Sequence, residues 1–208
     1  MGALLRNFTS GSAPPELVGD RVYLRMPQQS DYVGWARVRQ ESRAFLEPWE
    51  PTWATDALTR AAYRRRLDRY AREIREDRGI AFFIFDKQDG HILGGITLSQ
   101  ICRGVTQSST VGYWIGRPHA RQGFMADTLK VVIRFVFLGL RMHRLEAACI
   151  PSNLPSQGLL KKSGFREEGL AREYLCINGV WQDHKLFAII SSDPWHAKPT
   201  KPKFIKAV

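Results

Sequence analysis

Residues 111–130, VGYWIGRPHARQGFMADTLK, have the pattern of a strand, a short polar turn and the start of a helix. VGYWIG is apolar enough for a buried strand. The helix continues with apolar residues three, one, three, one and three positions apart, namely Leu129, Val132, Ile133, Val136, Phe137 and Leu140. This spacing places all six side chains on one helical face. One glycine, Gly123, stands where the helix begins, so the turn lies between a strand end and a helix N-terminus.

A turn of this kind can bind an anion. A helix N-terminus leaves up to four backbone N–H groups without partners, and its dipole favours negative charge. Gly123 removes a side chain where an anion would approach the backbone, and Arg121 adds a positive charge. The stretch contains neither a GxxxxGK[ST] nor a GxGxxG motif. From these residues alone, an ordinary helix start and a phosphate cradle both remain open.

The rest of the chain predicts one mixed α/β domain over residues 17–192, between a flexible leader (1–16) and a basic tail (193–208). The predicted order is β-α-α-β-β-β-α-β-α-β-β, with a mostly antiparallel sheet flanked by helices. Asn178-Gly179 predicts a tight hairpin between the last two strands. The predicted strands cover residues 21–26, 80–87, 91–102, 109–116, 143–150, 165–177 and 180–190. The predicted helices cover residues 30–43, 56–78, 124–140 and part of 151–165.

Composition limits the partners. The net charge of +11 favours an anionic partner such as a phosphorylated cofactor, a nucleic acid or a nucleoprotein surface. No apolar run approaches the roughly 18 residues of a membrane span. Cys102, Cys149 and Cys176 are far apart and odd in number. They suggest neither a metal site nor a disulfide framework, and so favour the reducing cytoplasm.

Several segments together resemble a known family. GYWIG, RQGFMADTL, HRLEAACIPSN, LLKKSGFREEG and the NGxWxDH hairpin follow one another in the second half of the chain. Together they resemble the Gcn5-related N-acetyltransferases (GNAT), and among these the ribosomal-protein N-terminal acetyltransferases of the RimJ/RimL type. The resemblance covers roughly residues 17 to 192, and LLKKSGFREEG and the hairpin are its most specific parts.

The resemblance implies an acetyl-CoA site, while the spacing of His119, His143 and His184 suggests no metal site. The pyrophosphate would rest on backbone N–H groups of the turn. The pantetheine arm would pair with the strand end at Ile115, where two strands splay apart, and Asn153 would hydrogen-bond the arm. Three positions depart from the family pattern. Ala120 stands where the family usually has Gln or Arg, and Met125 where it has Gly or Ala. Leu160 stands where many members have a tyrosine that acts as the general acid. The residues implied in the turn are Arg121, Gln122, Gly123, Phe124, Met125 and Ala126.

Acetyl transfer to an amine needs a base, an oxyanion donor and a partner for the leaving sulfur. An α-amino group has a pKa of about 7.7 to 8.0 and needs only modest help from a carboxylate. Glu168 matches the RimL-type base position and is favoured, while Glu146 is the alternative. A backbone N–H near Ile115 would stabilise the oxyanion. Ser156 would hydrogen-bond the sulfur.

The leading hypothesis is a cytoplasmic enzyme, monomeric or homodimeric, that acetylates the N-terminal amine of a ribosomal protein of the alanine or serine type. Its basic residues would contact rRNA, and no membrane is involved. One alternative is acetylation of a small amine or an antibiotic. Another is a non-catalytic acyl-CoA- or RNA-binding module, in which the basic tail and the arginine-rich helix would carry the binding. Interleaved aromatic residues such as Tyr63, Tyr70 and Phe204 are present but sparse, and no RNA-recognition signature appears.

The loop EPWEPTW, residues 47–53, leaves two interpretations open. Its two tryptophans either fill the edge of the core or form a wall of the acceptor pocket.

Overall fold

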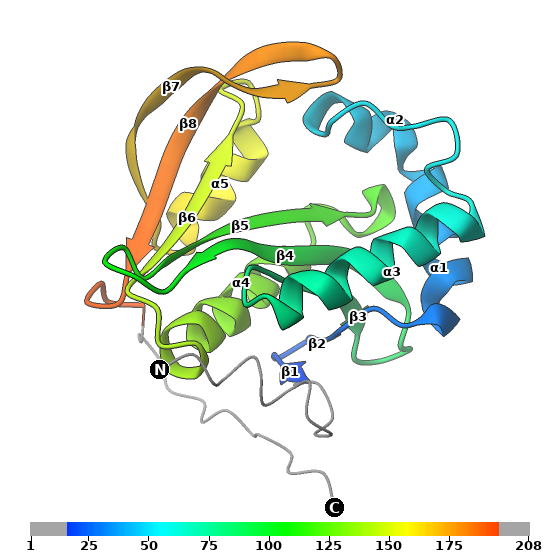
Figure 1. Ribbon diagram of the computed structural model, residues 1–208, viewed down its shortest axis with the longest axis horizontal. Helices are drawn as coiled ribbons and strands as arrows, with labels where there is room; N and C mark the ends of the chain where they lie inside the picture. Colours follow the sequence, from blue (N-terminus) through cyan, green and yellow to red (C-terminus); the bar gives the residue numbers. More distant parts are fainter. Residues whose placement is uncertain (1–15, 196–208) are drawn as a thin grey trace, which may run out of the picture.

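The computed structural model describes residues 16–195. It contains an eight-stranded sheet with helices on both faces (Figure 1), which confirms the predicted mixed α/β fold. The strands are β1 (Leu17–Val18), β2 (Val22–Arg25), β3 (Ile80–Asp86), β4 (Ile92–Cys102), β5 (Ser108–Ile115), β6 (Arg144–Cys149), β7 (Arg166–Ile177) and β8 (Val180–Ile190). The helices are α1 (Tyr32–Glu41), α2 (Arg43–Leu46), α3 (Arg60–Arg75), α4 (Phe124–Arg134) and α5 (Leu154–Lys162). In this part of the chain, every helix is too short or too polar to cross a bilayer.

The ends of the chain are only partly described. Residues 1–15 of the predicted leader and 196–208 of the predicted tail, including Phe204, lie outside the described residues. Of the tail, Asp193 pairs with Arg166 at 2.8 Å, and the Trp195 ring lies 5.1 Å from that of Phe137. These first tail residues therefore pack against the domain.

The predicted order of strands and long helices is confirmed, with some differences in detail. The helix expected over residues 124–140 is α-helical only to Arg134 and continues as a π-helical turn, Phe135–Gly139. A two-residue strand, β1, precedes β2 and pairs with it. The short helix α2 follows α1. The helix expected over residues 56–78 is shorter, Arg60–Arg75. It begins there because the Thr59 hydroxyl accepts a hydrogen bond from the N–H of Ala62 at 3.2 Å and caps the helix.

Tyr63, one of the sparse aromatic residues interleaved with the arginines of α3, is not exposed. Its side chain is fully buried, and its hydroxyl donates a hydrogen bond to the backbone carbonyl of Gln28 at 2.7 Å. It packs near Trp35 and Phe83 inside the domain. Tyr63 therefore cannot stack on a nucleic-acid base.

The strand pairing changes from antiparallel to parallel in the middle of the sheet. Its order is β1-β2-β3-β4-β5-β6-β8-β7, and every neighbouring pair is antiparallel except β5 with β6. The parallel pair keeps register over three residues only, from Ser108 opposite Arg144 to Thr110 opposite Glu146. Beyond Thr110 the rest of β5 has no partner on that side, so a gap opens between the two strands.

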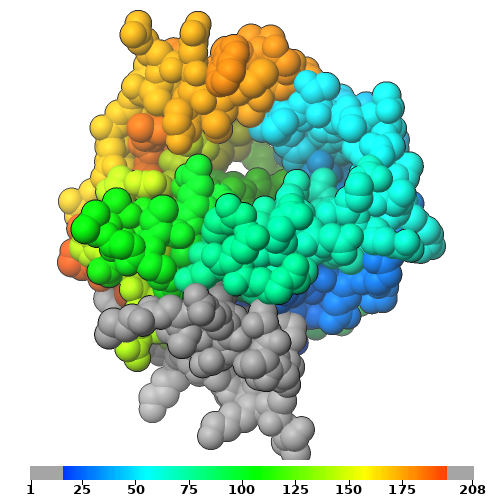
Figure 2. Space-filling view, viewed as in Figure 1, coloured from blue at the N-terminus to red at the C-terminus, as the bar shows by residue number. Residues whose placement is uncertain are grey.

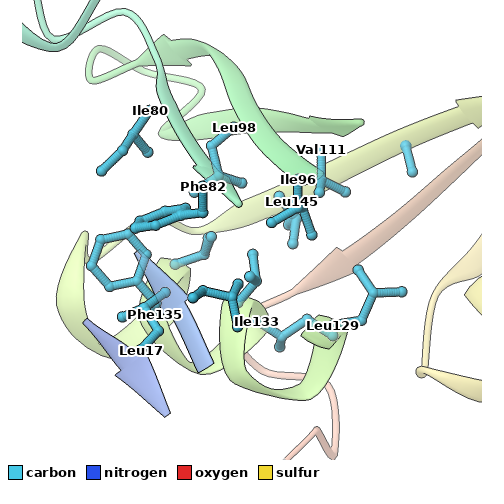
Figure 3. Packing of buried hydrophobic residues seen from close by; sticks show 14 of the residues in the cluster. Leu17, Ile80, Phe82, Ile96, Leu98, Val111, Leu129, Ile133, Phe135 and Leu145 are labelled. Atoms are coloured by element: carbon cyan, nitrogen blue, oxygen red, sulfur yellow. The ribbon is translucent and has the colours of Figure 1, made fainter. Parts of the chain in front are cut away.

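Two cores lie on opposite faces of the sheet. The larger one packs α4 against the sheet, and Figure 3 shows Leu129 and Ile133 of α4 facing Ile96, Val111 and Leu145. The smaller one packs α1 and α3 against the alternate residues of β3. Phe82 and Ile84 belong to the first core, whereas Phe83 and Phe85 belong to the second. This alternation follows from the two-residue period of a strand.

The β7–β8 hairpin forms as predicted. Asn178 and Gly179 have φ angles of 46° and 79°, the left-handed values that a tight hairpin turn requires at both positions. The hairpin lies at the edge of the sheet and extends toward α2 in Figure 1.

Candidate active site

The turn before α4 has the backbone of an anion site. Arg121 and Gly123 have φ angles of 61° and 88°, so the chain reverses tightly there. Gly123 is the N-cap residue of α4. Within residues 16–195, the backbone N–H groups from Arg121 to Ala126 have no protein acceptor. Successive N–H groups at a helix start can surround an anion.

The side chains of the turn leave this backbone accessible. Arg121 and Gln122 are exposed, whereas Phe124 and Met125 are buried and belong to the large core. Met125, which departs from the family pattern, therefore points away from the exposed N–H groups. The guanidinium of Arg21 lies 4.1 Å from the centre of the Phe124 ring and donates a hydrogen bond to the carbonyl of Gln122 at 2.7 Å. The turn is thus held from its outer side.

A pocket lies beside the turn. Gly123, Ala126 and Lys130 line it from α4, Arg21 from the β1–β2 turn, and Lys162 from the end of α5. Three of these five residues, Arg21, Lys130 and Lys162, are cationic. The pocket also contains two carboxylates, of which Asp127 accepts a hydrogen bond from the N–H of Arg21 at 2.8 Å.

The gap between β5 and β6 exposes a strand edge. Gly116 donates its N–H to Leu93 on the β4 side at 2.8 Å. Because successive residues of a strand direct their N–H groups to opposite sides, the N–H of Ile115 points toward β6. β6 does not pair with β5 at that point. The edge at Ile115 is therefore open, at the place where the resemblance puts the pantetheine arm.

Asn153 and Ser156 lie together at the start of α5, as the sequence predicted. The Asn153 side-chain oxygen accepts a hydrogen bond from the N–H of Ser156 at 3.1 Å and caps the helix. The Asn153 amide nitrogen remains a potential donor to a ligand. Because α5 follows β6, both residues stand at the open end of the gap.

Tyr113 of β5 reaches across the gap to this group, which the sequence reasoning missed. Its hydroxyl lies 2.9 Å from the Ser156 hydroxyl. Burial raises the pKa of Tyr113 to about 12, so the phenol keeps its proton at neutral pH. Burial also raises the pKa of the Cys149 thiol, against a smaller lowering by a hydrogen bond with Ser156. The only sequence signal was the position of Tyr113, two residues before Ile115.

The two candidate bases share one cation. Arg144 of β6 donates its Nε–H to Glu146 at 2.6 Å and an Nη–H to Glu168 at 3.0 Å. This hydrogen bonding lowers the pKa of Glu168, with a smaller opposing effect of burial. Arg144 stands opposite Ser108, at the closed end of the gap. Within the described residues, no hydrogen bond joins this group to Ser156.

Leu160 belongs to the core and offers no polar group to the site. Leu160 is buried with 1% of its surface exposed, so the position where many family members have a tyrosine is filled by core packing here. Over residues 16–195, no group of three or more His, Cys, Asp or Glu side chains is arranged to hold a metal ion.

Comparison with known proteins assigns the family. Residues 21–166 match the model of the acetyltransferase (GNAT) domain. The chain is 34% identical to "Probable N-acetyltransferase YjcK" of Bacillus subtilis, over 85% of this chain and 98% of the relative. It is 32% identical to the ribosomal protein uS5-alanine N-acetyltransferase of Escherichia coli, over 89% of this chain and 96% of the relative.

Solved structures agree. The structure of Mycobacterium smegmatis RimJ in complex with CoA-disulfide superposes with a TM-score of 0.81 at 31% identity, covering 86% of this chain and 88% of that one. The ribosomal-protein-S5-alanine acetyltransferase of Vibrio fischeri gives 0.78 at 31% identity, covering 88% and 99%. The chain therefore belongs to the GNAT family of acetyl-CoA-dependent N-acetyltransferases, with relatives of the RimJ/RimL type.

Proposed function

We propose that the protein acetylates the N-terminal α-amino group of a ribosomal protein whose first residue is alanine or serine. The Escherichia coli relative, an alanine N-acetyltransferase of ribosomal protein uS5, supports this acceptor because the two chains align over nearly their whole lengths. The observation that carries the chemistry is the gap between β5 and β6. The Ile115 strand edge borders this gap, and Tyr113 and Ser156 meet across it.

The turn and the pocket fit the two ends of the CoA nucleotide. Acetyl-CoA supplies an activated acetyl thioester on a long arm that ends in a phosphorylated nucleotide. The backbone N–H groups from Arg121 to Ala126 would hold the pyrophosphate. Lys130 and Lys162 in the adjoining pocket would neutralise the phosphate on the ribose. Asn153 and the Ile115 edge would hold the arm.

The residues around the gap would then divide the reaction between them. The amine nitrogen forms an amide bond to the acetyl carbon while the carbon–sulfur bond breaks. The Ile115 N–H would stabilise charge on the carbonyl oxygen. Glu168, with Glu146 as the alternative, would take the proton of the amine through a chain of waters, because Arg144 holds both carboxylates at the closed end of the gap. Ser156 would donate a hydrogen bond to the sulfur as it leaves.

Tyr113 extends this scheme. A phenol with a raised pKa remains a donor, and its hydroxyl lies 2.9 Å from that of Ser156. When Tyr113 donates to the Ser156 oxygen, the hydrogen of Ser156 is free to point at the sulfur. We therefore assign Tyr113 the role of orienting Ser156.

The charge of the chain supports a ribosomal setting. Arg64, Arg65 and Arg72 are exposed on α3, and the whole chain carries a net charge of +11. Basic surfaces are attracted to rRNA. An acceptor of this kind places the reaction in the cytoplasm.

The experiment is a CoA-release assay with acetyl-CoA and a panel of acceptors. The panel contains peptides with a free N-terminal alanine or serine, lysine peptides with a blocked N-terminus, and aminoglycosides. Preferred turnover of the free N-terminal peptides supports the proposal. Preferred turnover of the blocked lysine peptides or the aminoglycosides would replace it with the corresponding acceptor class.

A further inference from the structure

An opening with a continuous rim lies next to the gap. Figure 2 shows a hollow that passes through the molecule between the sheet, the orange β7–β8 hairpin and the cyan segment around α2. The cyan segment continues into the loop at residues 47–53, which we call the acceptor loop. Asn178 at the hairpin tip donates its N–H to the carbonyl of Glu50 at 3.0 Å. A Cβ on Gly179 would lie 3.8 Å from the Thr52 hydroxyl. The loop and the hairpin therefore meet and complete the rim of the opening.

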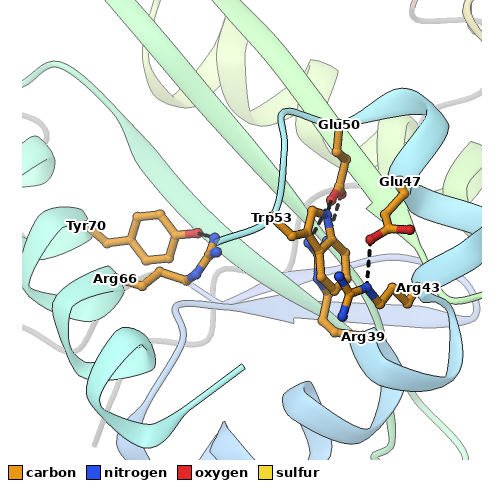
Figure 4. Close-up of polar contacts among 7 residues, drawn as sticks. All are labelled: Arg39, Arg43, Glu47, Glu50, Trp53, Arg66 and Tyr70. Carbon is orange, nitrogen blue, oxygen red and sulfur yellow. Dashed lines mark hydrogen bonds and ion pairs between the residues drawn. The ribbon is translucent and has the colours of Figure 1, made fainter. Parts of the chain in front are cut away.

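The acceptor loop is fixed by one buried arginine. Arg39 of α1 is only 8% exposed, and its guanidinium donates two hydrogen bonds of 2.7 Å to the two carboxylate oxygens of Glu50 (Figure 4). The Trp53 indole donates a third hydrogen bond to Glu50 at 2.8 Å. The guanidinium also lies 4.2 Å from the Trp53 ring and 4.8 Å from the Trp114 ring. The planar fork and the ring stacking are properties of arginine that lysine lacks.

The same arginine touches the strand that borders the gap. Trp114 and Tyr113 are neighbours on β5, and their side chains lie on opposite faces of the sheet. Tyr113 packs with the α4 core and reaches Ser156, whereas Trp114 packs with the α1 and α3 core and reaches Arg39. The turn before α4, which would bind the nucleotide, and the acceptor loop thus lie on opposite faces of the sheet.

We propose that Arg39 is a positioning residue for the acceptor. Its guanidinium lies near the Trp53 and Trp114 rings and holds the Glu50 carboxylate. It thereby keeps the Glu50 carbonyl on Asn178 and the rim of the opening intact. The acceptor amine reaches the gap through this opening, on the face opposite the nucleotide turn. The inference rests on the proposed function and adds residues that specify how the acceptor is admitted.

The test is Arg39→Lys, which keeps the charge and removes the fork. Loss of charge-assisted hydrogen bonds to Glu50 should raise the KM for the acceptor peptide about tenfold. The Kd for acetyl-CoA should stay within about twofold, because the nucleotide turn is on the other face. The matched control is Arg103→Lys, which alters another forked arginine–carboxylate pair, with Asp77, that contacts neither the acceptor loop nor the turn, and should change neither value.

A double-mutant cycle separates positioning from general damage. Arg39 acts on the acceptor loop through Glu50, so Glu50→Gln alone should also raise the acceptor KM. In the Glu50→Gln background, Arg39→Lys should cause almost no further increase. If Arg39→Lys does not fold, Glu50→Gln takes its place with the same expected direction.

Three results would overturn the inference: an unchanged acceptor KM in the folded variant, an equal loss of acceptor and acetyl-CoA affinity, or the same further increase in acceptor KM with and without the Glu50 carboxylate. A wild-type protein that transfers acetyl to no peptide would instead reject the proposed function, and the inference with it. An active wild-type protein with an unaffected Arg39→Lys variant rejects the role of Arg39 alone.

Discussion

Tyr113→Phe removes one hydroxyl group and tests whether the phenol orients Ser156. The two hydroxyls lie 2.9 Å apart across the gap, on β5 and α5. Without the phenol, the Ser156 hydroxyl loses the partner that leaves its own hydrogen available to the sulfur. The ring of Tyr113 and its packing remain, so the variant should fold as the wild type does.

The expected losses follow from the hydrogen bonds involved. A neutral hydrogen bond contributes about 1 kcal/mol, so Tyr113→Phe should lower kcat about fivefold. Ser156→Ala removes a donor to a sulfur that becomes negatively charged, where a hydrogen bond contributes about 1.5 to 3 kcal/mol. That corresponds to a loss of roughly ten- to a hundredfold in kcat. In the Ser156→Ala background, Tyr113→Phe should cause almost no further loss.

Steady-state kinetics of the four proteins in this cycle measure the coupling between the two residues. The control is Tyr23→Phe, since Tyr23 stacks on Phe85 at 4.9 Å in the opposite core and should leave kcat unchanged. The orienting role is refuted if Tyr113→Phe has no effect. It is also refuted if the variant loses the same factor with and without the Ser156 hydroxyl.

Three further predictions concern the base, the turn and the pocket. Glu168→Gln should lower kcat more than acetyl-CoA affinity. Arg144 lowers the pKa of Glu168, so Arg144→Gln should raise the pKa of that carboxyl. The base would then be protonated at higher pH, and the acidic limb of the kcat/KM profile should move to higher pH. An unmoved limb would argue against Glu168 as the base. Gly123→Trp should abolish acetyl-CoA binding in calorimetry, since Gly123 has φ of 88° at the helix start, and unchanged binding would reject the cradle. Lys162→Ala should weaken acetyl-CoA binding by up to about fivefold, as for an exposed ion pair, and leave the binding of acetyl-dephospho-CoA unchanged; equal weakening of both would place the ribose phosphate elsewhere.

Local signals made the fold predictable. The single apolar face after Gly123 predicted α4, and Asn178-Gly179 predicted the β7–β8 hairpin. Both signals lie within a few residues, where backbone preferences decide the structure. The start of α3 was placed four residues too early, because Thr59 caps the helix only after a turn that the apolar pattern does not reveal.

The site was predictable only in part, because long-range contacts build it. The turn before α4 and the Asn153–Ser156 pair are local, and the sequence singled them out. Tyr113 and Ser156 are 43 residues apart, and no periodicity connects them. The single cation shared by Glu146 and Glu168 likewise depends on how β6, β8 and β7 align.

The acceptor loop left two interpretations of its tryptophans, and the structure bears on one of them: Trp53 lies at the edge of the core, whereas the pocket-wall role of Trp49 stays a prediction. Trp53 is partly buried against Arg39, as a residue at the edge of the core would be. Trp49 is 36% exposed, in the short helical turn before Glu50. The contact with Arg39 decides this difference, and Arg39 lies on α1, outside the loop sequence.

The acceptor panel tests the central claim most directly. At pH 7, the fraction of amine that is neutral is roughly 200 times larger for an N-terminal α-amino group than for a lysine side chain, given their ordinary pKa values. The wild-type protein should therefore release CoA fastest with peptides that begin with alanine or serine and carry a free N-terminus. CoA release that is faster with N-terminally blocked lysine peptides or with aminoglycosides would contradict the account.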